Sequence, residues 1–174
     1  MHAAQRHEYV EFVTGVTEKL RRTAYLLTGD RHRADDVVQQ TLTQLFVKWP
    51  RARQADNVGA YVHRMLINAF RQERRSRWWG VQLFDRTPEP VPRGAPAGPD
   101  DDAVNAVAVR AALAAVPPGQ RVVLVLRFYA DLSVEQTAEV LGCSTGNVKS
   151  QTARGLTALR RQLPRDAESK ETAR

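Results

Sequence analysis

The chain has 174 residues, a hydrophobic fraction of 43% and a formal net charge of +7. This composition supports one ordinary domain or two small ones, and the positive charge favours a polyanionic partner. No apolar run is long enough to span a bilayer and the first residues lack the apolar centre of a signal peptide, so we expect a cytoplasmic protein without membrane insertion.

Charge and composition divide the chain into four segments. Residues 1–79 carry 14 basic and 8 acidic side chains, and residues 104–163 carry 7 and 3. Between them, residues 80–103 carry 2 basic and 5 acidic side chains together with 5 of the 9 prolines. We therefore expect a basic domain (1–79), a flexible, acidic, proline-rich linker (80–103), a second basic domain (104–163) and a disordered tail (164–174).

Hydrophobic residues at helical spacing predict three helices in the first domain. The first ends at Thr28-Gly29, and Asp30 is suited to cap the second. We expect Pro50 to end the second helix, because proline cannot continue a helical hydrogen-bond ladder. The predicted helices cover about 7–27, 30–49 and 59–78, with a polar loop over 50–58.

The third predicted helix carries a row of polar residues. Arg64, Asn68, Arg71 and Arg75 recur at intervals of three and four residues, which places them on one face, with Tyr61 beside them. Guanidinium groups next to an aromatic ring suit a phosphate backbone with unstacked bases. The alternative is a solvated helix whose arginines only keep the protein soluble.

The linker is long enough to separate two DNA-binding domains. Its 24 residues span at most about 75 Å, at roughly 3.1 Å per residue. Two DNA elements one and a half helical turns apart lie about 50–55 Å from each other. The two domains can therefore reach separate elements of one DNA duplex.

The second domain begins with two predicted helices. Pro118 is expected to open the second of them at its first helical position. The run Val122–Leu126 has β-propensity, but a lone strand would lack a partner, so we predict a helix. The first helix has an expected apolar face of Val104, Val107, Ala108, Ala111 and Ala115.

The last two predicted helices form a helix-turn-helix. Ser133 and Gln136 have the spacing of a capping box, and Gly142 suits a left-handed C-cap. The second helix, capped by Ser144 or Thr145, has an apolar stripe opposite a short, polar and basic face, which is typical of a helix that enters a major groove. A plain helical hairpin with a solvated face is the alternative. The expected DNA contacts are Ser144, Thr145, Asn147, Lys149, Ser150, Ala153, Arg154 and Thr157.

Three stretches resemble a known family. Residues 28–42, Thr-Gly-Asp-Arg-His-Arg-Ala-Asp-Asp-Val-Val-Gln-Gln-Thr-Leu, resemble region 2 of extracytoplasmic-function (ECF) sigma factors. So do residues 60–75, Ala-Tyr-Val-His-Arg-Met-Leu-Ile-Asn-Ala-Phe-Arg-Gln-Glu-Arg-Arg. Residues 117–133, Pro-Pro-Gly-Gln-Arg-Val-Val-Leu-Val-Leu-Arg-Phe-Tyr-Ala-Asp-Leu-Ser, followed by the helix-turn-helix, resemble region 4. The resemblance implies an all-α fold of two small helical domains that binds core RNA polymerase, recognises −10 and −35 promoter elements and promotes strand opening.

The resemblance also implies roles for individual residues. In the family, the second helix docks on the clamp helices of the largest polymerase subunit, region 4 binds the flap, and an anti-sigma factor is a further partner. By resemblance, the polymerase-binding candidates are Asp36, Gln39, Gln40, Leu45 and Trp49. The third helix and the loop before it read the −10 element and trap a flipped base, and their candidates are Asn57, Tyr61, Arg64, Asn68, Arg71 and Arg75. Gln40 and Gln72 depart from the acidic residues usual in the family.

Two other classes of DNA-binding protein carry a C-terminal helix-turn-helix. A ligand-responsive repressor needs a dimerising, pocket-bearing first domain, and a DNA recombinase needs a sheet domain with a nucleophile; the arginine-rich first domain suits neither. The four histidines match no metal motif, and the single cysteine, Cys143, excludes an internal disulfide and a thiolate zinc cluster. We therefore expect no cofactor, no metal and no catalytic residue. Stable binding to core polymerase would distinguish a sigma factor from both alternatives.

Overall fold

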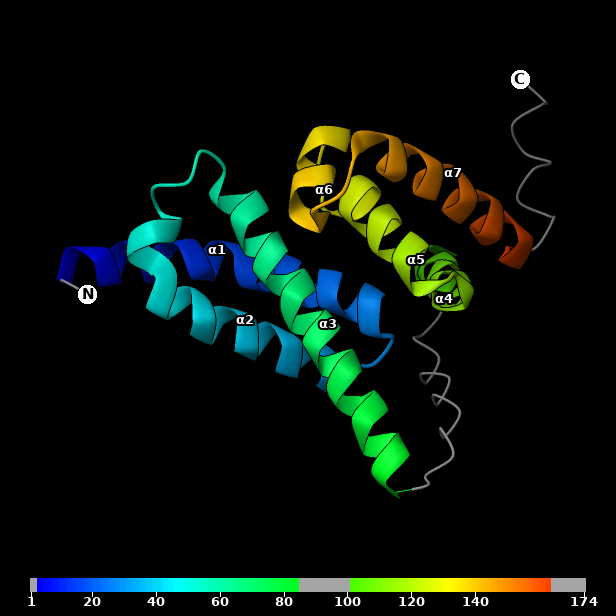
Figure 1. Cartoon of the computed structure of the whole chain (residues 1–174), viewed down its shortest axis with the longest axis horizontal. Helices are drawn as coiled ribbons and strands as arrows, with labels where there is room; N and C mark the ends of the chain where they lie inside the picture. The colour runs from blue at the N-terminus through cyan, green and yellow to red at the C-terminus, as the bar shows by residue number, and fades with distance from the viewer. Residues whose placement is uncertain (1–2, 85–100, 164–174) are drawn as a thin grey trace.

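The computed structural model describes residues 3–84 and 101–163, and within these ranges it is helical without strands, which confirms the all-α class. Figure 1 shows α3 crossing α1 and α2, with the helices of the second half beside them toward the upper right. The first half consists of α1 (Ala3–Thr28), α2 (Arg31–Ala52) and α3 (Val58–Phe84). The second half consists of α4 (Asp101–Ala115), α5 (Pro118–Leu124), the π-helical turn η1 (Val125–Tyr129), α6 (Val134–Leu141) and α7 (Thr145–Gln162).

The turn between α1 and α2 follows the predicted chemistry. Gly29 has a φ of 72°, a left-handed conformation that favours glycine. Asp30 caps α2, since its Oδ1 accepts a hydrogen bond from the Arg33 backbone N–H at 2.8 Å. This turn places α2 antiparallel to α1, and the two helices bury their apolar faces against each other and against α3.

Pro50 does not end α2, contrary to the expectation from the sequence. The helix continues to Ala52, and the Arg53 N–H still reaches the Trp49 carbonyl at 3.0 Å. Ala52 is fully buried in the core, so packing holds this last turn in place despite the proline. The polar loop is accordingly shorter than the predicted 50–58, because α3 already begins at Val58.

The helices also reach into both ends of the segment that the sequence assigns to the linker. That segment was predicted over 80–103, whereas α3 runs to Phe84 and α4 begins at Asp101. Residues 85–100 and the tail 164–174 lie outside the described residues, so the flexible linker and the disordered tail stay predictions.

The second half forms the predicted helices, and the predicted apolar face of α4 is correct only in part: Val107 and Ala108 are partly buried, and the side chain of Val104 lies outside the described residues. Val122–Leu126 is helical, as predicted, and is buried throughout. In α4, however, Ala111 and Ala115 are exposed, because the helix turns Ala112 and Leu113 inward instead. Alanine gives a weak periodic signal, since it is compatible with both core and surface.

Close packing of α5 on α7 depends on a glycine that the sequence did not single out. Gly155 is buried in the middle of α7, and a Cβ there would lie 3.0 Å from the Leu124 Cγ and 3.3 Å from the Gln120 Cβ. The missing side chain therefore lets the helix that carries the polar, basic face lie directly on α5.

Candidate nucleic-acid interface

The polar row predicted on α3 is exposed. Arg64, Asn68, Arg71 and Arg75 are all solvent-accessible, while Met65 and Ala69 beside them are buried. Most of the remaining circumference of the described part of α3 is covered, because α1 and α2 pack on one side and α6 on another. Solvent therefore meets α3 mainly along this basic stripe.

The residues at the start of α3 have structural contacts of their own. The Asn57 Oδ1 accepts a hydrogen bond from the Ala60 N–H at 2.9 Å and so caps α3. Tyr61 is partly buried and packs against the core. Asn57 and Tyr61, two of the predicted −10 residues, therefore lie at the start of the basic stripe. Asn57 also caps the helix, and Tyr61 also packs against the core.

The two positions that depart from the acidic residues usual in the family touch each other. The Gln40 Nε2 donates a hydrogen bond to the Gln72 Oε1 at 3.0 Å, which links α2 to the edge of the basic stripe. Two neutral amides at this point leave the positive charge of the stripe uncompensated. Burial lowers the pKa of the His63 imidazole, which disfavours its charged form, and its Nδ1 lies 2.8 Å from the Gly59 carbonyl oxygen.

The helix-turn-helix has the predicted geometry. Ser133 and Gln136 form both bonds of the capping box, at 3.1 and 2.8 Å. Gly142 takes the left-handed C-cap with a φ of 65°, and the Ser144 hydroxyl, rather than that of Thr145, caps α7 by accepting the Asn147 N–H. These caps fix the angle at which α7 leaves the turn.

One face of α7 is open and polar. Val148 is fully buried opposite it, and α7 packs on α4, α5 and α6 through its apolar stripe. The hydroxyls of Ser150 and Thr157 donate to backbone carbonyls of their own helix, at 3.0 Å each, which leaves their oxygens available as acceptors. All eight residues of the helix-turn-helix that were predicted to contact DNA are exposed: Ser144, Thr145, Asn147, Lys149, Ser150, Ala153, Arg154 and Thr157.

The predicted polymerase-binding set is only partly on the surface. Asp36 and Gln39 are exposed and Gln40 is partly so, but Leu45 is 0% exposed and Trp49 is 2% exposed. Leu45 and Trp49 belong to the core of this chain, so a partner that binds this structure would not reach them. Leu45 lies nine residues, or two and a half turns, after Asp36, and so occupies the opposite side of α2.

α2 also exposes apolar residues that were not among the predicted polymerase contacts. Val47 is 74% exposed and Phe46 is 44% exposed, and Val47 lies three turns after Asp36 on the same side of the helix. Together with Gln39, they border a groove of about 650 Å³ between α1 and α2. Helical spacing counted from Asp36 would have identified this face.

The groove combines an apolar floor with a polar rim. Phe46 packs edge-on against Tyr9 with ring centroids 5.3 Å apart, and the Tyr9 hydroxyl donates to the Leu42 carbonyl at 2.9 Å. At the other end, Arg21 pairs with Asp35 at 3.0 Å, and both side chains are more than half exposed. Such a surface suits a protein partner that brings both apolar and charged side chains.

Among the described residues, no group of three histidine, cysteine, aspartate or glutamate side chains is placed to hold a metal ion. No helix in the described ranges is long and apolar enough to cross a membrane.

Comparison with protein families matches the two halves separately. Residues 12–80 match the model of sigma-70 region 2, and residues 106–159 match that of sigma-70 region 4. These are the two regions of an RNA polymerase sigma factor, a transcription initiation factor rather than an enzyme in itself.

The RNA polymerase sigma-E factor of Streptomyces coelicolor is 34% identical over 160 residues, covering 90% of this chain and 86% of the relative. The ECF sigma factor EcfG of Rhodopseudomonas palustris is 29% identical, with coverages of 84% and 80%. The chain belongs to the extracytoplasmic-function family of RNA polymerase sigma factors.

Solved structures agree with this assignment. The sigma factor RpoE of Bartonella quintana, in complex with the anti-sigma factor NepR, matches with a TM-score of 0.78 and 27% identity, covering 89% of this chain and 96% of RpoE. CnrH, in complex with the cytosolic domain of CnrY, has a TM-score of 0.62 at 21% identity and shows the shared fold.

Proposed function

We propose that the chain directs core RNA polymerase to promoters through three surfaces: the outer face of α2, the basic stripe of α3 and the open face of α7. The observation that carries the proposal is that each of these surfaces is solvent-exposed while the opposite face of its helix is buried. The polymerase supplies the chemistry of RNA synthesis, and this chain supplies recognition and strand opening in the cytoplasm.

The α2 surface is proposed to bind the polymerase. Its polar part consists of Asp36, Gln39 and Gln40, and its apolar part consists of Phe46 and Val47 in place of the buried pair that the sequence suggested. Apolar side chains in the centre of a polar rim are typical of protein interfaces. The groove beside them gives a partner helix a place to insert side chains.

The α3 stripe is proposed to bind the −10 element. Arg71 and Arg75 suit phosphates, whereas Asn68 can both donate to and accept from a base edge. Tyr61 offers part of an aromatic ring at the start of the same helix, where an unstacked base could rest.

The α7 face is proposed to bind the −35 element, and Arg154→Ala tests it. Arg154 is exposed near the middle of the helix and can reach a base edge or a phosphate. We expect weaker binding of a −35 duplex, by about 1–3 kcal/mol, and relaxed specificity at one position if the contact is to a base. Fluorescence anisotropy on matched and single-mismatch duplexes measures both. Unchanged anisotropy together with an unchanged melting curve would remove Arg154 from the interface.

An anti-sigma factor is a proposed regulator, because the RpoE structure that matches most of this chain was solved with one. The function as a whole is tested by run-off transcription on genomic fragments with purified core polymerase. Specific initiation that depends on this chain supports it. Failure to bind core polymerase would favour the repressor or recombinase alternatives.

A further inference from the structure

The two halves of the described chain share one hydrophobic core. A continuous cluster joins buried residues of the first half, such as Leu20, Leu27 and Leu66, to Val125 and Leu126 of the second. Leu26 of α1 also packs against the separate cluster formed by α4 and α5. The last turns of α1 thus form a docking surface for the second half.

A single arginine joins the two halves at this surface. The Arg121 Nη1 donates to the Leu27 carbonyl at 3.0 Å, and Nη2 donates to the Ala114 and Val116 carbonyls at 2.6 and 3.1 Å. Leu27 lies in the last turn of α1, while Ala114 and Val116 lie at the end of α4. Carbonyls at a helix C-terminus lack partners within the helix and carry partial negative charge, so a guanidinium between two such ends satisfies both.

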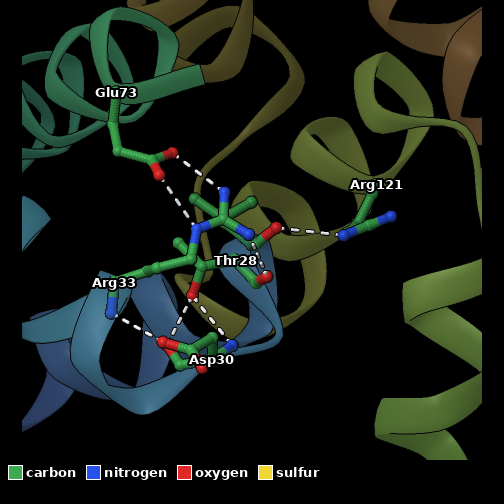
Figure 2. A network of polar contacts seen from close by, with 6 residues as sticks. Thr28, Asp30, Arg33, Glu73 and Arg121 are labelled. Carbon is green, nitrogen blue, oxygen red and sulfur yellow. Dashed lines mark hydrogen bonds and ion pairs between the residues drawn. The ribbon is translucent and has the colours of Figure 1, made fainter. Parts of the chain in front are cut away.

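Two other arginines near this junction have partners of their own. Figure 2 shows Arg33 occupied by Glu73, with two bonds of 2.9 Å, and by the Thr28 carbonyl at 3.2 Å. Burial lowers the pKa of Arg121, with a further contribution from Arg74 and Arg33. Another cation, Arg110 of α4, lies over the Tyr25 ring of α1, 5.8 Å from its centroid.

In this arrangement the two DNA-binding helices are close together. α3 packs on α6 and α6 packs on α7, as Figure 1 shows. At 8–10 Å between packed helix axes, α3 and α7 lie about 16–20 Å apart where α6 separates them. The −10 and −35 elements are about 50–55 Å apart. Each DNA face is open, but the two cannot meet both elements of one promoter until the halves separate.

We propose that Arg121 is a latch that holds the free sigma factor closed and limits the simultaneous binding of both promoter elements. The inference rests on the proposed function and concerns its regulation. It separates two steps: binding to one element is possible in the closed form, and binding to both requires the latch to open.

The experiment measures the distance between the halves in the full-length protein without DNA or polymerase. Spin labels are placed at His32→Cys on α2 and Ala111→Cys on α4, two exposed positions flanking the junction, in a Cys143→Ser background. Double electron–electron resonance is expected to give one short distance in this parent. Arg121→Gln should raise the ratio of long to short distances by about tenfold, because the charged hydrogen bond that joins the halves, to the Leu27 carbonyl, is lost. Arg160→Gln, which removes the same charge from an exposed position on α7, should leave the distribution unchanged.

Binding to an isolated −35 duplex should be the same for Arg121→Gln and the parent, whereas binding to a duplex with both elements should be tighter for Arg121→Gln. Long distances already dominant in the parent, or a parent-like distribution in a folded Arg121→Gln protein, would overturn the proposal. If Arg121→Gln loses its helical spectrum, Arg121→Lys decides by the same criterion, since lysine keeps the charge but cannot bridge both helix ends. Failure of the sigma function itself would appear in the run-off assay and not in these distances.

Discussion

Val47→Asp should weaken binding to core polymerase while leaving the melting curve nearly unchanged. Val47 is 74% exposed, so a charge there costs little in the free protein. In the proposed complex the same charge would be buried against an apolar partner surface without a counterion. We expect at least about tenfold weaker binding, or 1.4 kcal/mol, measured by surface plasmon resonance with core polymerase.

Leu45→Ala is the contrasting variant. Leu45 is fully buried, and its loss should lower the free energy of unfolding by about 2–5 kcal/mol, measured by urea denaturation. Val10→Asp serves as the matched control, because Val10 is 53% exposed on α1 and does not border the groove. If Val10→Asp weakens polymerase binding as much as Val47→Asp, the α2 face is not the specific contact.

Leu45 and Trp49 show where family resemblance and helical periodicity are best combined. Resemblance places both residues on the polymerase-binding helix, but it does not say which side of that helix they occupy. The Trp49 ring centroid lies 5.5 Å from that of Tyr9 and 5.2 Å from that of Phe12. Trp49 of α2 therefore packs against two aromatic rings of α1 and holds these two helices together. Counting turns from Asp36 separates these core residues from Val47 with no structure in hand.

Other features were readable from local chemistry alone. The caps at Asp30, Ser133 and Gly142 each depend on a side chain or a glycine acting within four residues, and the structure contains all three. The Arg64 to Arg75 stripe followed from helical period, because a charged row has only one stable orientation, toward water.

The contact between the halves was not predictable in the same way. The continuous apolar run Val122–Leu126 indicates burial on more than one side, but periodicity does not say which surface covers it. Arg121 bonds to backbone carbonyls, which every residue possesses, so no sequence pattern indicates its partners. The packing role of Gly155 was not predictable for a similar reason, since it depends on the Leu124 side chain, which lies on another helix.

Asn68→Ala should impair promoter opening at one −10 position while leaving polymerase binding intact. Extruding a base costs a few kcal/mol of stacking and pairing, which a protein must return through stacking and hydrogen bonds to the base edge. Asn68 is exposed between Arg64 and Arg71 and can make such edge bonds. Permanganate footprinting on a cognate promoter measures the loss of opening, and a base change at the affected position should no longer matter to the variant.

Arg71→Ala and Arg75→Ala provide the matched comparison on the same stripe. Both side chains are exposed and suit phosphates, so their removal should lower affinity for every sequence and reduce the salt dependence of binding by about one ion each. Asn68 carries no charge, so its removal should leave that salt dependence unchanged. Because the three substitutions alter one continuous surface, a difference between them reflects chemistry rather than location. Full opening by Asn68→Ala on matched and mismatched −10 sequences alike would mean that α3 holds only the backbone of the DNA.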